Sequence, residues 1–393
     1  MLVEIHMLQN HAPSNLNRDD TGSPKDAIFG GVRRARISSQ ALKRAIRRSE
    51  IFQHALERAG HGWRTRQLPE RVRQILLERG LSEEMAHIGA LKASGFGNKE
   101  GREQAPRESD GLVRTAQTMF LTAADIEAVA DVIYKAALEA KTPAQFKKVS
   151  AKELEAAVRD SGRPITPDIA LFGRMVTSSA FRDVESAIQC AHAISTHPMT
   201  HEFDFYTAVD DFEKPGESDE DRGADMMGDV EFTSACFYKY FSIDVDGIVE
   251  NLTSKGTDGM PVAEARSLAV DTVLAFLEAA AFTSPSGKQN TFAAHQLPDA
   301  VLVEVKSRKI PVSYANAFVN PVSLRAKEGL VVASIRQFID HVKLMTRKFS
   351  LASECRLWFT TIDAELEGAA TCDTFAELLQ NLRSELQKAG SNG

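Results

Sequence analysis

Cysteine is scarce in this chain, and long apolar runs are missing. The four cysteines are far apart in the sequence: Cys190, Cys236, Cys355 and Cys372. That spacing offers neither a CxxC pair for zinc nor a dense disulfide framework, so we expect four reduced thiols that serve core packing. The most apolar stretch, residues 269–282, carries Asp271 and Glu278 and is too short to cross a bilayer. Residues 1–6 lack the basic start and the uninterrupted apolar stretch that a secretion signal needs. We therefore expect a cytoplasmic protein with no membrane partner.

Sequence signatures of common active sites are also absent. There is no HExxH, no GxSxG elbow and no complete Walker A loop, because Phe282 and Gln289 replace residues which that loop requires. His192, His197 and His201 lie close in sequence but have no accompanying cysteine pair. The prediction is therefore a protein without catalytic residues, bound metal or cofactor.

Positive charge is rare overall but concentrated in one segment. The 393 residues carry a formal net charge of −7, which by itself argues against nucleic acid as a partner. Residues 18–48, however, hold nine Lys or Arg against three Asp, about +6, which leaves about −13 for the remainder. Such an asymmetry indicates a localised polyanion site on an otherwise acidic body.

The basic segment reads as strand, loop, strand and helix. Residues 2–8 alternate like a half-buried strand, and a polar loop follows. Gly30 and Gly31 allow backbone to approach a ligand closely and lead into an extended run, 32–37, in which Arg34 and Arg36 share a face. Ser38 or Ser39 can cap the next helix, whose free N–H groups and positive dipole end suit phosphate. Lys43 and Arg47, one turn apart on that helix, add full charges along one stripe.

Other interpretations of these residues stay open. The basic helix also fits a solvated face that pairs with acidic surface elsewhere. Asp19, Asp20 and Asp26 suit either a divalent metal for phosphodiester cleavage or loop-ordering contacts with nearby cations. A second loop, residues 284–291, surrounds Lys288 with small hydrogen-bond donors and is either a phosphate or sugar grip or a plain turn.

The rest of the pattern predicts a mixed α+β body with two insertions. Residues 60–160 are mostly helical in pattern, and 182–195, 263–282 and 331–347 also predict helices, whereas 230–245 and the run Val301, Val303, Val305 predict strands. The acidic stretch 201–231 is flanked by apolar residues and predicts a projecting hairpin. The order fits an interleaved βαββαβ arrangement.

Several segments resemble one known family closely. They are Asn15-Leu16-Asn17-Arg18-Asp19-Asp20, the run from Pro24 to Gln40, Phe172-Gly173-Arg174-Met175, the run from Ala191 to His197, Thr207-Ala208-Val209-Asp210-Asp211 and Gly287-Lys288-Gln289. Together they resemble the crRNA-binding backbone subunit of type I-E CRISPR Cascade, the CasC family of the RAMP superfamily.

The resemblance implies an α+β fold with a ferredoxin-like, RRM-like palm, an inserted helical fingers domain and a β-hairpin thumb. On that basis we divide the chain into palm segments 1–55, 181–199 and 231–393, fingers 56–180 and thumb 200–230. The residues that it implies hold guide RNA are Asn17, Arg18, Lys25, Ser38, Gln40, Lys43, Arg44, Arg47, Arg174, Met175, Lys288 and Gln289. The thumb residues that it implies are Phe205, Tyr206, Thr207 and Val209. The long acidic thumb tip and Phe172 depart from the family pattern.

The function that the resemblance implies is a scaffold for antiviral defence. Copies of the chain would polymerise head to tail as a helical filament along crRNA and present its bases to target DNA. The large, small, 5′-end cap and crRNA-processing subunits of the effector complex would be further partners. One alternative is a metal-dependent ribonuclease that cuts target RNA like type III backbone subunits, with Asp19, Asp20 or Asp26 as candidates. Another is a solitary protein that binds single-stranded RNA.

Overall fold

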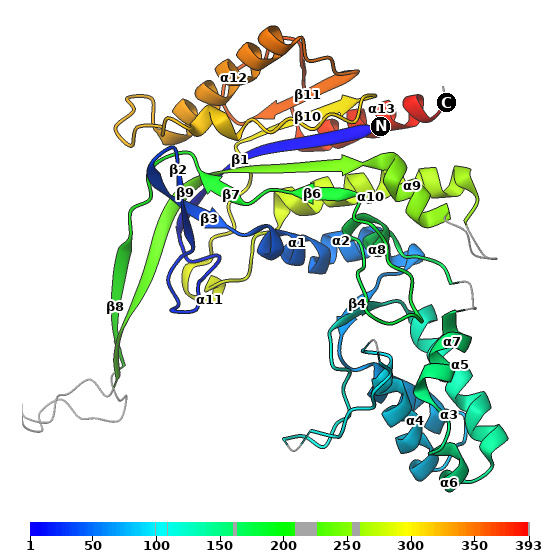
Figure 1. The fold of residues 1–393 in the computed structure, drawn as a ribbon. Helices are drawn as coiled ribbons and strands as arrows, with labels where there is room; N and C mark the ends of the chain where they lie inside the picture. Colours follow the sequence, from blue (N-terminus) through cyan, green and yellow to red (C-terminus); the bar gives the residue numbers. More distant parts are fainter. Residues whose placement is uncertain (99, 108, 160–162, 209–225, 254–259, 392–393) are drawn as a thin grey trace, which may run out of the picture. The chain divides into compact units, whose positions relative to one another are not determined.

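A mixed β-sheet forms the centre of one of two compact units in the computed structural model (Figure 1). The structure describes residues 1–98, 100–107, 109–159, 163–208, 226–253 and 260–391. The first unit, which we call the palm unit, consists of Met1–Phe52, Gln189–Ile243 and Leu274–Gly393. The second, the helical unit, consists of Gln53–Ile188 and Asp244–Val273. The mixed α+β class predicted from the sequence is confirmed.

The main sheet has the order β12-β11-β10-β1-β9-β7-β3-β2, with β6 and β8 also paired to β9. Its strands are β1 (Leu2–Ser14), β2 (Asp26–Phe29), β3 (Val32–Ile37), β6 (Ile188–Cys190), β7 (Ala193–Ser195), β8 (Glu202–Ala208), β9 (Met226–Asp244), β10 (Ala300–Lys306), β11 (Cys355–Thr360) and β12 (Ala370–Thr371). Strand β10 lies between β1 and β11 and pairs antiparallel with both, which brings the N-terminal strand close to the C-terminal part of the sheet. The strands predicted at 2–8, 32–37, 230–245 and 301–305 are confirmed.

Helices cover both faces of this sheet. Those of the palm unit are α1 (Ser39–Arg48), α2 (Glu50–Ala55), α10 (Val262–Phe282), α11 (Gln289–Phe292), η2 (Ala315–Phe318), α12 (Leu330–Phe349) and α13 (Phe375–Ser391), of which α2 and α10 continue into the helical unit. Phe338 of α12 stacks on Trp358 of β11 on one face. On the opposite face the ring of Phe241, in β9, packs edge-on against Phe276 of α10. Consecutive residues of a strand point to opposite sides, so β9 contributes side chains to both faces of the sheet. The helices predicted at 263–282 and 331–347 are confirmed.

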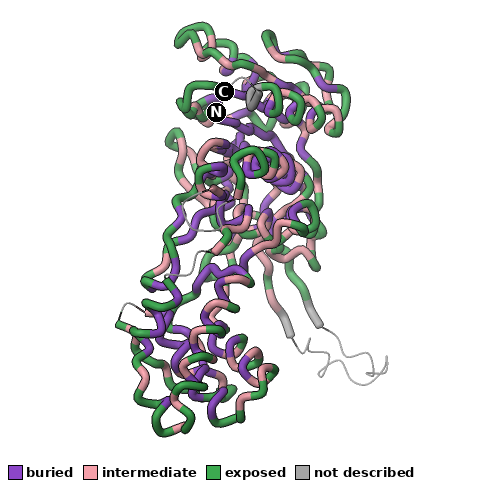
Figure 2. The backbone as a smooth tube through the Cα atoms, turned by 90° about the vertical axis from the view of Figure 1, so that its right-hand side faces the viewer, coloured by how far each residue is buried: buried purple, intermediate pink, exposed green. Residues whose placement is uncertain are grey.

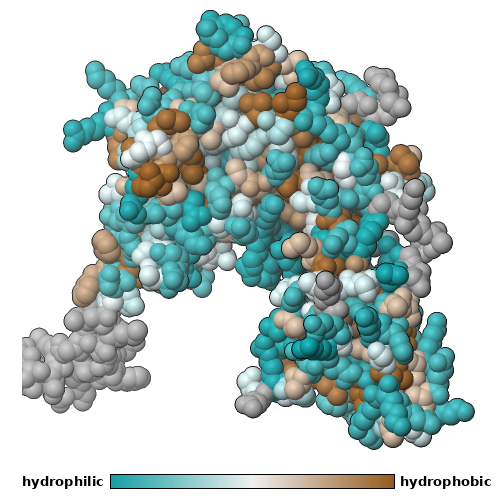
Figure 3. Space-filling model, viewed as in Figure 1, coloured by the Kyte–Doolittle hydropathy of each residue, from teal (hydrophilic) through white to brown (hydrophobic). Residues whose placement is uncertain are grey.

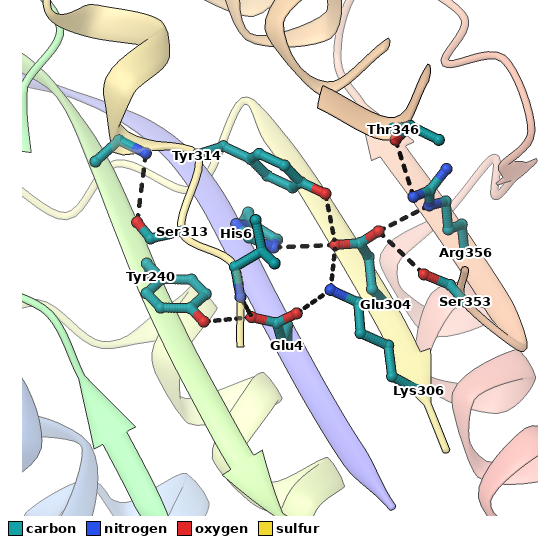
Figure 4. A network of polar contacts seen from close by, with 12 residues as sticks. Glu4, His6, Tyr240, Glu304, Lys306, Ser313, Tyr314, Thr346, Ser353 and Arg356 are labelled. Atoms are coloured by element: carbon teal, nitrogen blue, oxygen red, sulfur yellow. Dashed lines mark hydrogen bonds and ion pairs between the residues drawn. The ribbon is translucent and has the colours of Figure 1, made fainter. Parts of the chain in front are cut away.

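Strand β1 is buried on both faces, which corrects the half-buried strand predicted from its alternation (Figure 2). Its polar side chains, Glu4 and His6, point into a buried network on the α12 side. Glu304 of β10 is the centre of that network (Figure 4) and accepts hydrogen bonds from Tyr314 (3.1 Å) and Arg356 (2.7 Å). Polar and apolar side chains do alternate along β1. Its polar side chains are covered by α12 and η2, however, and make their hydrogen bonds within the protein instead of with water.

The carboxylates of Glu4 and Glu304 can be buried side by side because neighbouring cations neutralise their charge. Glu4 and Glu304 are direct cross-strand partners, and Lys306 pairs with both. Burial alone would raise the pKa of Glu304, but its hydrogen bond to His6 and the charges of His6, Lys306 and Arg356 outweigh burial and lower that pKa far below its usual range. The network therefore fixes the register of β1 against β10 by polar pairing.

The helical unit is built around its own apolar core. Its elements are η1 (Glu57–Ala59), β4 (Trp63–Thr65), α3 (Leu68–Glu78), α4 (Glu83–Gly95), β5 (Met119–Leu121), α5 (Ala123–Ala140), α6 (Pro143–Phe146), α7 (Ala151–Arg159), α8 (Pro167–Phe172) and α9 (Val245–Thr253). Val72, Ile88, Ile133 and Phe146 are among the fully or almost fully buried residues of that core. Among the described residues, no helix is long and apolar enough to span a membrane. All four cysteines are free thiols.

One element differs from the sequence-based prediction, and the compact units have their own boundaries. The helix predicted at 182–195 is absent: this segment forms β6 and β7, which pair with β9, and β7 also pairs with β3. Asp244–Val273, which the sequence-based division placed in the palm, clusters with the helical unit. Residues 181–188 do the same.

Candidate nucleic-acid interface

The loop that follows β1 is held in one shape by its own polar groups. The amide of Asn15 donates to the carbonyls of Gly22 and Glu231, both at 2.9 Å. The carboxylate of Asp19 accepts hydrogen bonds from Thr21 N, Thr21 Oγ1 and Ser23 N at 2.7–3.0 Å. These bonds, the Thr21 hydroxyl first, lower the pKa of Asp19. Asp19 therefore orders its own loop through Thr21 and Ser23, and not through the neighbouring cations that the sequence suggested as partners.

Asn17 and Ser38 join this loop to the start of α1. Ser38 N donates to Asn17 Oδ1 at 2.8 Å, and Ser38 Oγ accepts from Ala41 N as the N-cap of the helix. Lys25 N donates to the carbonyl of Asn17 at 2.8 Å, which closes the base of the loop. The polar groups of two predicted RNA-binding residues, Asn17 and Ser38, are thus used in part to position the loop and the helix.

Gly30, the first glycine of the β2–β3 turn, lies close to another part of the chain, whereas Gly31 has open space beside it. Gly30 has φ +60°, and a Cβ added there would clash with the carbonyl oxygen of Val319. The Arg34 side chain is buried and donates to the carbonyls of Ser195 (3.0 Å), Phe318 (2.8 Å) and Val319 (3.3 Å). Close backbone approach is therefore made to the chain's own 318–319 segment, and Arg34 is removed from the cations available to a ligand.

Helix α1 presents its charges around a small apolar stripe. Leu42 and Ile46 are buried, Lys43 is half-buried, and Arg44 and Arg48 are exposed. Within the described part of the chain, Lys43, Arg44 and Arg48 have no acidic residue within ion-pair distance. Arg47, on the same stripe as Lys43, is half-buried and does have a side-chain or backbone partner. Unpaired cations on one helix favour a polyanion over an internal acidic partner.

A pocket of about 930 Å³ opens beside these charges. Its walls are Leu16–Gly22, one side of α1 and residues 283–287: Leu16, Asn17, Arg18, Asp19, Asp20, Thr21, Gly22, Ala41, Arg44, Ala45, Arg48, Ser49, Thr283, Ser284, Pro285, Ser286 and Gly287. The loop that the sequence singled out as a second candidate therefore lies next to the first one. Gly287 makes this possible, because a Cβ there would clash with the carbonyls of Asn15 and Leu16.

Lys288 and Gln289 lie in the second half of the 284–291 loop. Lys288 adopts the left-handed conformation, φ 49°, at the start of the short helix α11. The Gln289 amide donates to the carbonyls of Pro285 and Ala294 and accepts from Ala294 N. The side chain of Gln289 therefore makes its hydrogen bonds within the loop and is less available to a ligand than predicted. Gln40, at the start of α1, is exposed.

His192 is a site residue that sequence reasoning missed. Its Nδ1 lies 3.2 Å from Ser39 N, in the first turn of α1, and 3.3 Å from Nη1 of Arg36. Because both neighbours are donors, Nδ1 is the unprotonated nitrogen. Partial burial, then Arg36 and Lys25, lower the pKa of His192, which favours the neutral ring. The only sequence signal was its place in the segment Ala191–His197, since periodicity does not connect it to α1.

Arg174 and Met175 belong to the helical unit and have opposite environments. Arg174 is buried and pairs with Asp125 at 2.7 Å, and its Nε donates to the carbonyl of Arg182 at 2.9 Å. The guanidinium that the resemblance assigned to guide RNA is thus already bound within the protein. Met175, the next residue, is 93% exposed.

The two arms of the predicted thumb, β8 and β9, form an antiparallel pair with Phe205 opposite Asp229 and Tyr206 opposite Gly228. Phe205 and Tyr206 are 65% and 42% exposed, and Phe203, which the sequence did not single out, is 66% exposed. Figure 3 shows apolar side chains on this hairpin. Thr207 lies in β8 with its side chain undescribed, and Val209 lies outside the described residues.

Three acidic and histidine side chains near the site, Asp26, His201 and His197, are engaged in local contacts. Asp26 pairs with Arg33, His201 pairs with Glu231, and His197 contacts the carbonyl of Pro198 at 2.8 Å. Within the described ranges, no group of three or more His, Cys, Asp or Glu is arranged to hold a metal ion.

The fold and the site define a mixed α+β protein with a cationic loop, helix and pocket on its palm unit. Residues 3–384 match the model of the family described as CT1975-like protein, so the chain belongs to the CT1975-like family of Cas proteins. No curated protein matches it significantly.

Two solved structures are similar over almost the whole chain. A chain of a structure described as "CRISPR RNA-guided surveillance complex, pre-nicking" is 28% identical with a TM-score of 0.81, and the alignment covers 98% of this chain and 100% of that one. A chain of a "CRISPR RNA-guided surveillance complex" is 23% identical with a TM-score of 0.72 over the same shares, which shows a shared fold.

Proposed function

We propose that this protein is a non-catalytic, crRNA-binding backbone subunit of a type I-E CRISPR Cascade effector complex in the cytoplasm. Copies would stack head to tail along the guide RNA with the other effector subunits and leave guide bases free to pair with target DNA. The observation that carries the proposal is the set of unpaired cations on α1, Lys43, Arg44 and Arg48, beside an ordered loop and a pocket. Similarity to chains of RNA-guided surveillance complexes supports the same assignment.

The division of labour follows from the chemistry of the site. Cations and backbone N–H groups recognise phosphate without regard to base identity, so they fix the position of RNA and leave sequence recognition to base pairing. The hairpin adds exposed aromatic rings, Phe205 and Tyr206, which suit contact with an unstacked base. A subunit with these two features holds the backbone of a guide and interrupts its base stack.

We infer no nuclease step in this chain. Of the three carboxylates that the nuclease alternative requires, Asp19 orders its own loop and Asp26 is paired with Arg33. Incubating the assembled complex with complementary RNA and Mg²⁺ tests this directly. The proposal predicts intact RNA, whereas periodic cleavage that disappears in Asp20→Asn would establish the nuclease.

Purification of the tagged chain from its host tests the backbone role. A backbone subunit predicts recovery of several copies of the chain with other effector subunits and RNA of uniform length. Recovery of the chain alone, or with RNA of scattered length and no partner subunits, would instead support a solitary RNA-binding protein.

A further inference from the structure

Asp20 lies in the wall of the cationic pocket but has no partner within the described part of the chain. Its two neighbours in the acidic set are both committed, Asp19 to Thr21 and Ser23 and Asp26 to Arg33. A free carboxylate repels phosphate, so its presence among Arg18, Arg44 and Arg48 weakens any site that serves phosphate alone. The arrangement fits a ligand that offers both an anion and a hydroxyl donor.

We infer that this pocket recognises the ribose 2′-hydroxyl of a bound nucleotide, and that Asp20 accepts its hydrogen bond. The inference rests on the proposed function and deepens it by assigning to one residue the choice of RNA over DNA. Arg44 and Arg48 lie one helical turn apart and would bind the two phosphates that flank this ribose. A 2′-hydroxyl is the group that distinguishes the two nucleic acids at a given position.

Asp20 is exposed, but the backbone on either side of it is ordered by its neighbours. Asp19 N donates to the carbonyl of Ser23 at 2.9 Å, and the Asp19 carboxylate binds three further donors, so the loop around Asp20 is closed on both sides. Residues 283–287 of the same pocket contribute Ser284 and Ser286, whose hydroxyls have no partner in the described ranges. These hydroxyls both donate and accept, and therefore suit the remaining sugar oxygens.

Charge and hydrogen bonding make separable contributions. Removing the charge of Asp20 reduces repulsion of phosphate equally for RNA and DNA, because both carry the same backbone charge. Removing the acceptor lowers affinity for RNA alone, because DNA has no 2′-hydroxyl to lose. The ratio of the two dissociation constants therefore isolates the hydrogen bond from the electrostatic change.

The experiment measures binding of the full chain to two oligonucleotides of identical base sequence, one of ribose and one of 2′-deoxyribose with uracil retained. Fluorescence anisotropy at fixed salt gives Kd(DNA)/Kd(RNA) for the parent, Asp20→Ala and Asp20→Asn, with Asp340→Ala as a matched control on exposed surface of α12. A hydrogen bond to a charged acceptor corresponds to a ratio change of about tenfold or more. We expect Asp20→Ala to lower the ratio by about that factor, Asp20→Asn to lower it less, and the control to leave it unchanged.

Different outcomes separate this inference from the proposed function. RNA binding with the same ratio in the parent and in Asp20→Ala overturns the 2′-hydroxyl contact and leaves the RNA-binding role standing. A ratio that collapses in the parent when EDTA is added shows that Asp20 acts through a divalent cation, which also overturns the direct contact. No RNA binding by the parent overturns the proposed function, and this inference with it.

Discussion

The Nη1 atom of Arg174 lies 2.7 Å from Oδ2 of Asp125, and both side chains are almost completely buried. Asp125 also accepts from Arg163 Nε at 2.7 Å and caps the start of α5 by binding Thr122 N at 3.0 Å. Arg174 therefore holds the helical unit together and places Met175 at its surface, which makes stability its main contribution.

Replacement of Arg174 tests this assignment. We expect Arg174→Met to lower the free energy of unfolding by about 3–5 kcal/mol, because it leaves a buried carboxylate without one of its partners. Met175→Ala is the matched change one residue away and should leave stability within about 0.5 kcal/mol, because its side chain is exposed. Urea unfolding measures both. If both variants changed the free energy of unfolding by the same small amount, the Arg174 guanidinium would not be a buried partner of Asp125.

Gly30 and Gly31 give a second matched pair. Both have positive φ, but only Gly30 is in tight contact with another part of the chain, the carbonyl of Val319. Gly31→Ala should cost about 1–2 kcal/mol from backbone strain alone. Gly30→Ala should cost clearly more, because the 318–319 segment that Arg34 binds must move. Thermal unfolding of the two variants decides, and similar melting temperatures would contradict the close approach.

His11 makes stability depend on pH. Burial, followed by the charge of Lys239, lowers its pKa from 6.5 to about 3. The unfolded chain therefore binds a proton between pH 6.5 and 3 that the folded chain does not, so this contribution to stability is complete above pH 6.5 and is lost as the pH falls. The loss amounts to about 2 kcal/mol by pH 5. His11→Gln, which is neutral throughout, should show a shallower fall in unfolding free energy over this range, and an identical slope would contradict the assignment.

Much of the fold was accessible from the sequence because its long elements have clear periodicity. Helices α10 and α12 and strands β9 and β10 fall where the pattern predicted them. The helix predicted at 182–195 was wrong because the helical spacing of Val184, Ile188 and Ala191 is a coincidence. Residues 188–190 and 193–195 of that segment pair with β9, and 193–195 also pair with β3. Strand pairing with residues distant in sequence is not visible in a local pattern.

The site was predictable as a charged segment but not as a set of contacts. Loop, helix and the 284–287 loop do converge on one pocket. Charge alone could not tell the exposed Arg44 from the buried Arg34, because burial depends on carbonyls about 160 and 284 residues away in sequence. For the same reason His192 was missed, and Asp19 and Asp20, adjacent in sequence, have different roles that only the loop geometry separates.

The salt dependence of RNA affinity tests the central claim most directly. A phosphate-binding surface releases counterions, so log Kd should rise steeply with log salt, and Lys43→Ala with Arg44→Ala should reduce that slope by about 1–2. Lys343→Ala with Lys348→Ala, exposed cations on α12, removes the same charge away from the pocket and should leave the slope nearly unchanged. Filter binding of the full chain to single-stranded RNA from 50 to about 300 mM salt provides the measurement. A flat salt series, or equal losses in the two double variants, would contradict a guide-binding surface on α1.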